Sequence, residues 1–402
     1  MTNNILFINT SWEQEALVKT IYDKGFNIFG ISKNAPSYLS LLKKHISCDI
    51  DDLSTIIKIV KLYEIDSIIS DNCDYSLLSS EIISDLMHLP MLSLEGAKIS
   101  NNKFLQRKII EKHNIKQPKY KLIEDFEDIK NFRKLINDKT LIKPIDSRGS
   151  IGITFLDIES KEDEISNAVA LALDNSPSKK CLIEEYISGE LLTIDGFLNK
   201  NFCLPVAIAN RERVSNGLIL TNKIIYNSKI NKKLASKCIS FLKSVANALD
   251  YKYGHIHCEA LLDKNNDLFL VECTNRGAGV FTSSIINPYV SGLDLNNFLL
   301  KIKTSSNLSL TNIKSENFEQ KDASLIFPSL GGSNKIIYSY DYQKILELEN
   351  VLSFRLLSKL GRPLPTPKDG LSRHFAISLA TSNEQEINET IEFIISNCFN
   401  IR

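Results

Sequence analysis

The stretch that decides the fold is GHIHCEALLDKNNDLFLVEC, residues 254–273. Two apolar runs flank the turn KNND (264–267), and asparagine tolerates the positive φ that twist-matched hairpin turns require. If the two asparagines form the loop, Glu259 directly faces Glu272 across the hairpin. Two facing carboxylates repel unless a cation lies between them, and Mg²⁺ prefers such oxygen ligands. A register that differs by one residue would instead turn one glutamate to solvent, so both readings stay open on the hairpin alone.

A second informative stretch is TLIKPIDSRGSIGITFL, residues 140–156. It places Lys143 on a strand, followed by a loop that contains Ser147, Gly149 and Ser150. Small residues let backbone N–H groups approach phosphate oxygens, and a lysine supplies a point charge at the edge of such a cradle. A Ser/Gly hairpin that is only a turn fits the same letters.

A third stretch, CLIEEYISGE (181–190), is an apolar strand that ends in carboxylates. The backbone after Glu184 and Glu185, as far as Ile187, has the extended form that can meet the edge of an adenine ring. A solvated acidic turn is the alternative.

Taken in order, these pieces resemble the ATP-grasp superfamily over roughly residues 96–300. Members of that family surround Mg-ATP with two lysines, a glycine-rich hairpin, a hinge strand that ends in glutamate, and two carboxylates on neighbouring strands. The resemblance implies ATP as the nucleotide and Mg²⁺, or Mn²⁺, as the metal. The residues that it implies for ATP are Lys103, Lys143, Ser147, Gly149, Ser150, Glu184, Glu185, Ile187 and Glu190. Those implied for the metal are Glu259, Glu272 and Thr274.

Some positions depart from the family pattern. Thr274 stands where the family usually has an asparagine ligand, and it offers one hydroxyl in place of an amide oxygen. Leu191 stands where a glutamate commonly binds the ribose, so Glu190 is expected to reach the ribose from one place earlier. Asn102 occupies the place of an aspartate before Lys103.

The resemblance implies an ATP-dependent carboxylate–amine ligase, in which a carboxylate forms an acyl phosphate and an amine then displaces phosphate. Arg276 is the expected catalytic residue, steadying the developing oxyanion. An ion pair between Arg276 and Glu259 or Glu272 is the structural alternative. The expected partners are a small-molecule carboxylate and a small-molecule amine, and a homodimer is compatible with the family.

Weaker substrate candidates are Arg211, Arg213, His257 and Gly277. A solvated charge run is the alternative for the two arginines. His255, His257 and Glu259 alternate along one strand face, which also fits a transition-metal site, but packing or substrate contact is the favoured reading of the histidines.

Two other functions remain open. A bicarbonate-dependent carboxylase or carbamoyl-forming enzyme would use the same nucleotide site with bicarbonate in place of the organic acid. A non-catalytic ATP-binding module would keep the site without turnover, which Leu191 and Thr274 make conceivable.

Changes in the residue pattern along the sequence predict the domain organisation. Residues 1–95 show the β-α-β rhythm of a small parallel sheet, without the G-x-G-x-x-G of a dinucleotide site. The expected ATP-grasp core is 96–305, with a mobile lid at about 140–190, followed by a Ser/Thr/Asn-rich linker at 306–320. An α+β subdomain at 321–402 closes a mixed-sheet body. Trp12 and Asp71 follow strands of the first domain and are weak candidates for substrate contact, with core packing favoured for Trp12.

The composition bounds the class of protein. The 402 residues carry 48 Lys+Arg and 48 Asp+Glu, so no net charge favours nucleic acid or an anionic membrane. The amino terminus lacks a basic and then apolar leader, and no apolar run approaches the ~20 residues of a membrane span. We therefore expect a cytoplasmic protein whose eight cysteines, none in a C-x-x-C motif, stay reduced and mostly buried.

Overall fold

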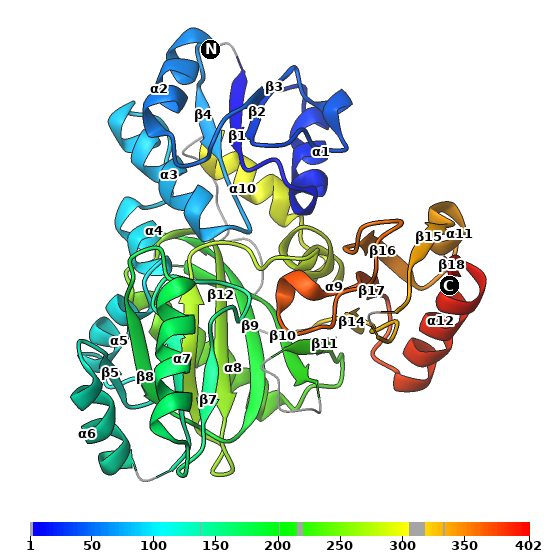
Figure 1. The fold of residues 1–402 in the computed structure, drawn as a ribbon. Helices are drawn as coiled ribbons and strands as arrows, with labels where there is room; N and C mark the ends of the chain where they lie inside the picture. The colour runs from blue at the N-terminus through cyan, green and yellow to red at the C-terminus, as the bar shows by residue number, and fades with distance from the viewer. Residues whose placement is uncertain (1–2, 137, 201, 215–219, 305–317, 333) are drawn as a thin grey trace.

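The computed structural model describes residues 3–136, 138–200, 202–214, 220–304, 318–332 and 334–402 (Figure 1). The linker predicted at 306–320 lies almost wholly outside these residues. Within the described part of the chain, no helix combines the length and the apolar character needed to cross a bilayer.

The N-terminal domain is built on a parallel sheet of order β3-β2-β1-β4, as the sequence predicted. Its strands are β1 (Asn4–Ile8), β2 (Asn27–Ser32), β3 (Lys44–Ser47) and β4 (Ser67–Ile69). Its helices are η1 (Trp12–Gln14), α1 (Glu15–Asp23), η2 (Leu39–Leu41), α2 (Leu53–Leu62), α3 (Asp74–Leu86) and α4 (Leu94–Ser100). Helix α10 (Leu295–Thr304) returns from far along the chain to pack against β4 and α1 (Figure 1). The Ser67 hydroxyl donates to the Lys303 carbonyl across this contact at 2.6 Å.

The chain from Leu94 to Glu111 forms two helices, α4 and α5 (Lys103–Glu111), in place of one continuous helix. The reason is Asn102, whose side chain accepts the Leu105 N–H at 3.0 Å and caps the new helix. Asparagine at this position satisfies a backbone donor that the helix leaves free. Lys103 is therefore the first residue of α5, and from there its side chain contacts Glu272 and the Ser147 carbonyl.

A second, four-stranded sheet of order β5-β8-β6-β7 forms what we call the lid subdomain, residues 120–185. Its strands are β5 (Tyr120–Leu122), β6 (Thr140–Pro144), β7 (Thr154–Leu156) and β8 (Cys181–Glu185). Helices α6 (Phe126–Ile136) and α7 (Glu162–Asp174) pack on it. The sheet includes β5, so it extends to the N-terminal side of the predicted range of 140–190.

The largest sheet has the order β13-β12-β9-β10-β11-β14-β17-β16. Its strands are β9 (Glu190–Asn199), β10 (Phe202–Arg213), β11 (Thr221–Tyr226), β12 (Tyr253–Leu262), β13 (Leu268–Thr274), β14 (Ala323–Ile326), β16 (Val351–Leu356) and β17 (Phe375–Leu379). All its neighbours pair antiparallel, where a mixed sheet was predicted. The C-terminal strands extend this sheet, so the tail is continuous with the core (Figure 1).

The remaining elements cover the large sheet and its end. Helix α8 (Lys232–Ala248) packs its apolar face on β9, β10 and β13. The others are η3 (Thr282–Ile286), α9 (Asn287–Ser291), β15 (Ile337–Tyr340), α11 (Tyr342–Leu346), η4 (Gly370–Ser372), α12 (Glu384–Asn397) and β18 (Phe399–Ile401).

The β12–β13 hairpin confirms that Glu259 pairs with Glu272, although its turn differs from the prediction. The strands end at Leu262 and Leu268, and Asn266 takes φ 61°, so the loop is longer than two residues. A bulge next to Glu259 then restores the register. One extra residue in a bulge shifts the pairing by one position, which cancels the shift introduced by the longer loop.

Candidate active site

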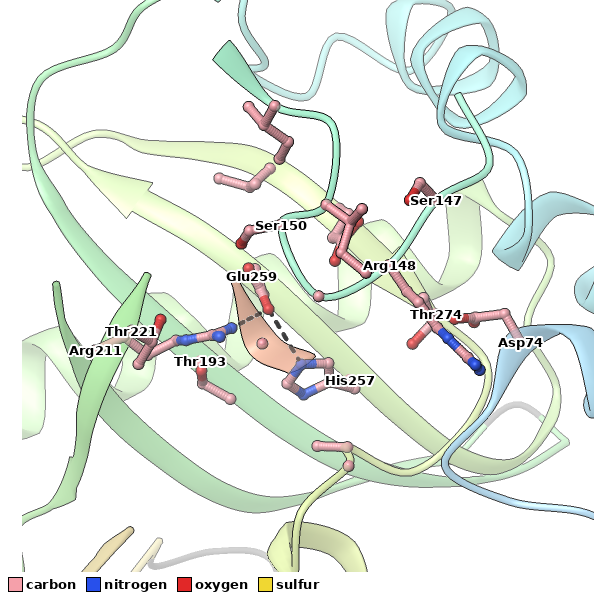
Figure 2. Close-up of a pocket in the computed structure, with 18 of the residues that line it drawn as sticks. Asp74, Ser147, Arg148, Ser150, Thr193, Arg211, Thr221, His257, Glu259 and Thr274 are labelled. Carbon is pink, nitrogen blue, oxygen red and sulfur yellow. Dashed lines mark hydrogen bonds and ion pairs between the residues drawn. The ribbon is translucent and has the colours of Figure 1, made fainter. Parts of the chain in front are cut away.

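All the predicted site residues except Glu190 and Gly277 line one cavity of about 450 Å³. The large sheet forms its floor, and the loop 145–153 between β6 and β7, here called the lid loop, lies over it. Figure 2 shows Ser147, Arg148 and Ser150 on this loop above Glu259 and His257. Further lining residues come from segments 9–13, 72–75, 276–282, 325–327 and 370–373.

The two facing glutamates both line the cavity, but each has a different cationic partner. Glu259 forms an ion pair with Arg211 of β10, and Glu272 lies 3.0 Å from Lys103 Nζ. Burial alone would lower the pKa of Lys103, yet Glu272 raises it above its ordinary value. The repulsion expected between the two carboxylates is therefore offset by protein cations, and the predicted substrate residue Arg211 is held by a predicted metal ligand.

His257 also lies against Glu259. Its Nδ1 is 2.7 Å from Asp195 Oδ1, and its Nε2 is 3.5 Å from Glu259 Oε1. Burial disfavours the charged ring, but Asp195 and Glu259 outweigh it and raise the pKa of His257 to about 9. An imidazolium at neutral pH donates from both nitrogens and cannot serve as a base. His255, by contrast, is buried against the Phe197 ring at 5.0 Å and does not line the cavity.

A buried cluster holds Lys143 at the other side of the cavity. Lys143 Nζ lies 2.7 Å from Glu184 Oε2, and Arg107 donates to both oxygens of the same carboxylate at 2.9 and 3.3 Å. Burial raises the pKa of Glu184, but Arg107 and Lys143 outweigh it and hold it below its ordinary value. For Lys143 burial wins, aided by Arg107, and its pKa falls to about 8. The Glu184 side chain thus orients two cations, while Glu185 and Ile187 line the cavity beside it.

The lid loop is fastened over the cavity by contacts from two other segments. Lys103 Nζ donates to the Ser147 carbonyl at 2.7 Å, and the Tyr75 hydroxyl donates to the Asp146 carbonyl at 2.6 Å. Gly149 (φ 63°) and Ser150 (φ 61°) both adopt the left-handed backbone that the sharp loop requires. Ser147, Gly149 and Ser150 all line the cavity, as the predicted phosphate cradle requires.

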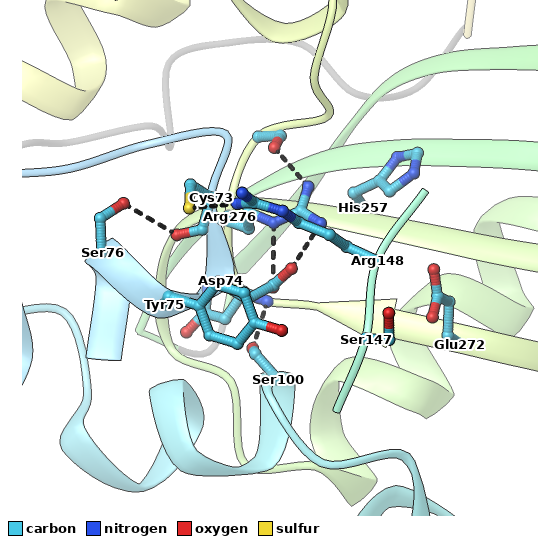
Figure 3. Close-up of polar contacts among 12 residues, drawn as sticks. Cys73, Asp74, Tyr75, Ser76, Ser100, Ser147, Arg148, His257, Glu272 and Arg276 are labelled. Carbon is cyan, nitrogen blue, oxygen red and sulfur yellow. Dashed lines mark hydrogen bonds and ion pairs between the residues drawn. The ribbon is translucent and has the colours of Figure 1, made fainter. Parts of the chain in front are cut away.

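Arg276 lines the cavity but forms neither of the two ion pairs considered from the sequence. Its guanidinium binds Asp74 through two hydrogen bonds of 2.9 and 2.8 Å, from Nε and Nη2 (Figure 3). Burial opposes the charge, but Asp74 outweighs it and raises the pKa of Arg276. Asp74 stands at the first residue of α3, so the N-terminal domain fixes the orientation of the predicted catalytic arginine.

Glu190 and Gly277 do not lie where they were predicted to act. Glu190 is exposed and outside the cavity lining, whereas Leu191 and Thr193 line it, because successive side chains of β9 point to opposite faces. Gly277 donates to Asp71 Oδ1 at 2.6 Å, and a Cβ there would lie 2.3 Å from Ser283 Oγ. Its lack of a side chain therefore serves close packing inside the protein, with no room for a substrate.

The other weak candidates divide in the same way. Asp71 accepts the Gly277 N–H and the Ser283 hydroxyl, and it does not line the cavity. Trp12 packs edge-on against Phe281 at 5.1 Å, in agreement with the packing role favoured for it. Arg213 lines the cavity, and burial lowers its pKa.

The donor set fits a Mg²⁺ ion with bound phosphate. Among the residues that the structure describes, no three His, Cys, Asp or Glu side chains gather to hold an ion by themselves. Mg²⁺, however, commonly takes one or two carboxylates and completes its octahedron with water and phosphate oxygens. Glu259 and Glu272 supply those carboxylates on one face, and the Thr274 hydroxyl beside them is sealed without a hydrogen-bond partner.

Three residues of the site escaped the sequence argument. Arg107 lies four residues after Lys103 on the same helix face, a spacing that could have indicated a shared role. Arg148 stands within the quoted loop, where its Nη1 lies 2.7 Å from Cys73 Sγ. Nothing local in the sequence marks Asp74, because its contact with Arg276 joins segments about 200 residues apart.

Comparisons with known proteins agree with this geometry. Residues 136–284 match the family model of the ATP-grasp domain. The chain is 24% identical over 266 residues to alanine–anticapsin ligase of Bacillus subtilis (strain 168). The alignment covers 61% of this chain and 56% of the relative, so it spans little more than half of the relative's length.

Solved structures share the fold over nearly the whole chain. L-amino acid ligase from Bacillus licheniformis superposes with a TM-score of 0.80 at 14% identity, covering 99% of this chain and 98% of that one. The biotin carboxylase domain of Hydrogenobacter thermophilus 2-oxoglutarate carboxylase gives a TM-score of 0.80 at 12% identity, covering 100% and 91%. Likeness at such identities establishes the architecture alone. The match to the family model of the ATP-grasp domain covers residues 136–284, less than half of the chain.

Proposed function

We propose that this protein is an ATP-dependent ligase that activates a carboxylate as an acyl phosphate and joins it to an amine, releasing ADP and phosphate. The observation that carries the proposal is the convergence on one cavity of two facing glutamates and two lysines beneath a Ser/Gly loop. Hydrolysis of the acyl phosphate is the competing reaction, and a fastened lid loop limits it by excluding water.

The proposed reaction has two steps. A carboxylate oxygen of the substrate attacks the γ-phosphorus of ATP and ADP leaves. The amine then attacks the acyl carbon, loses a proton, and phosphate leaves. The residues of this chain act by position and charge: Lys103 and Lys143 meet phosphate oxygens, and Arg276, oriented by Asp74, faces the oxyanion.

Mg²⁺ held by Glu259 and Glu272 would neutralise the phosphate oxygens when bound. Arg211 and Lys103, which pair with these carboxylates, would then exchange them for other partners. Arg211 and Lys103 would then be free to contact anionic groups of the nucleotide or of the substrate.

The experiment is an assay of purified protein with Mg-ATP and paired panels of carboxylates and amines, in which ADP, phosphate and the amide product are measured. The proposal requires ADP release that depends on both substrates and yields an equal amount of amide. Release of ADP with bicarbonate and no organic acid would replace it with the carboxylase reading. Tight Mg-ATP binding without turnover on any mixture would replace it with the ATP-binding module.

Two further expectations accompany the ligase. Amino-acid ligases occur among the relatives, and one structural relative was crystallised as a dimer, so we propose small-molecule substrates and a homodimeric assembly. Cytoplasmic location stays a prediction from the sequence. Light scattering of the purified protein measures the assembly.

A further inference from the structure

Glu13 is a cavity-lining carboxylate that has no cationic partner among the described residues. Its Oε1 accepts the Val280 N–H at 2.6 Å, while its Oε2 accepts no hydrogen bond and is not sealed by protein. Burial raises the pKa of Glu13, although the Val280 N–H and Arg276 act against it. Four other carboxylates of the lining, Asp74, Glu184, Glu259 and Glu272, each have a lysine or arginine within ion-pair distance. The remaining two, Asp146 and Glu185, accept hydrogen bonds from protein groups instead.

The backbone that holds Glu13 is itself unusual. Val280 and Phe281 are consecutive residues with φ of 50° and 65°, a conformation that is strained for β-branched and bulky side chains. Such strain persists where the surrounding structure imposes it, and it gathers at binding sites. Here it turns the Val280 N–H toward Glu13, and Gly279 leaves space above the carboxylate, because a Cβ there would lie 3.1 Å from Oε1.

Arg373 is the opposite case: like Arg148 and Arg213 of the same lining, it has no carboxylate within ion-pair distance among the described residues. It lines the same cavity, lies over the Phe327 ring at 3.5 Å, and donates from Nη2 to the Thr221 carbonyl at 2.8 Å. Its Nε is buried without a hydrogen-bond partner, and its Nη1 makes no hydrogen bond within the described part of the chain. Burial, reinforced by Arg211, lowers its pKa to about 9.

These two unpaired charges face one cavity without satisfying each other. Each acts electrostatically on the other, yet no ion pair joins Glu13 to Arg373. Partly buried charges without partners are unfavourable, so a protein retains them where a ligand completes them. A ligand that carries both an ammonium and a carboxylate group would neutralise both at once. A simple carboxylic acid would leave Glu13 unpaired.

We propose that the cavity binds its carboxylate substrate as a zwitterionic amino acid, with the ammonium group on Glu13 and the carboxylate on the side of Arg373. This inference rests on the proposed ligase function and names its substrate class. Glu13 and Arg373 then act as specificity residues, one from η1 of the N-terminal domain and the other from the end of η4, just before β17.

The experiment measures binding, so that it does not depend on turnover. The full-length protein is saturated with Mg²⁺ and a non-hydrolysable ATP analogue and titrated calorimetrically with the proteinogenic amino acids. Each amino acid that binds is paired with its des-amino carboxylate, for example alanine with propionate. The variants are Glu13→Gln, Glu13→Asp and Arg373→Gln, and the matched controls are Glu15→Gln and Arg362→Gln, which alter exposed side chains nearby in the chain.

We expect at least one amino acid to bind at least tenfold more tightly than its des-amino partner. Glu13→Gln should remove that preference, because the amide still accepts the Val280 N–H but has no charge for an ammonium group. Glu13→Asp should retain part of the preference, and Arg373→Gln should weaken both ligands at least tenfold. Both controls should match the unmodified protein.

Equal binding of amino acids and des-amino acids, binding of no amino acid, or a preference unchanged in Glu13→Gln would each overturn the inference. Failure of the ligase function would look different, because it would leave amino-acid binding intact while ADP release stays absent. The affinity for the ATP analogue and the melting temperature of each variant show whether it is folded.

Discussion

Glu259 and Glu272 lie directly opposite each other on β12 and β13, yet each carboxylate has its own cation, Arg211 for one and Lys103 for the other. Basic side chains of the protein thus neutralise both carboxylates. Arg211 and Lys103 also line the cavity in which the phosphate groups are proposed to bind. The first prediction tests this pair.

Glu259→Gln and Glu272→Gln should each reduce ADP release by about 10²-fold or more, because each removes a negative charge from the proposed Mg²⁺ site. The measurement is the initial rate of ADP release at several Mg²⁺ concentrations. Glu190→Gln is the matched control, since Glu190 lies on β9 outside the cavity, and it should leave the rate unchanged. Equal rates in all three variants would contradict the metal assignment.

Affinity for ATP should fall as the pH rises through 8. The pKa of Lys143 is lowered to about 8, so the lysine is charged below this pH and neutral above it, and a neutral lysine cannot neutralise phosphate. One such group predicts about a tenfold loss of affinity between pH 7 and pH 9. Calorimetry with an ATP analogue measures it. Lys143→Arg stays charged throughout, so its affinity should be nearly constant, and an equal fall in that variant would refute the assignment.

Arg107→Met should destabilise the protein by about 3–5 kcal/mol, because it leaves the buried Glu184 with Lys143 as its remaining cationic partner. Urea unfolding followed by circular dichroism measures the change. Lys19→Met breaks an exposed pair with Asp23 and should cost less than about 1 kcal/mol. Equal free energies of unfolding for the two variants would show that the buried cluster does not stabilise the protein more than an exposed ion pair does.

Tyr75→Phe should loosen the lid loop, because it removes the hydroxyl that donates to the Asp146 carbonyl. A net hydrogen bond of about 0.5–1.5 kcal/mol corresponds to a rise of about two- to tenfold in the KM for ATP. Hydrogen exchange should also become faster across residues 145–153. Tyr22→Phe changes an exposed tyrosine and serves as the control. Unchanged exchange in the Tyr75 variant would show that another contact fastens the loop.

Local patterns predicted the parallel N-terminal sheet and the facing glutamates. The hairpin shows how far such patterns reach, because its loop is longer than predicted and a bulge restores the pairing. The loop residues specify the turn, but the bulge at Val271 also involves a distant segment, since Arg107 donates to the Val271 carbonyl. The predicted pairing of Glu259 with Glu272 is therefore correct because two differences from the prediction, the longer loop and the bulge, cancel each other.

The direction of each side chain decided which predicted site residues line the cavity and which do not. Glu190 and Leu191 are neighbours in the chain, but the alternation of β9 sends only Leu191 into the cavity. Gly277 was expected to let a substrate approach the backbone, but Asp71 and Ser283 occupy the space beside it. A family motif identifies positions in the chain. The direction of the side chain at each position depends on the strand in which it lies.

The sequence by itself indicated the order of the elements, the lysines and carboxylates that line the cavity, and a resemblance to the ATP-grasp superfamily, because these depend on periodicity and short-range spacing. Only the tertiary structure decided which charges are paired with each other. Asp74 meets Arg276, Arg107 meets Glu184, and Glu13 and Arg373 are left unpaired on one cavity, through contacts between distant segments. Charge interactions depend on distance and burial, and both are set by how the sheets pack against one another.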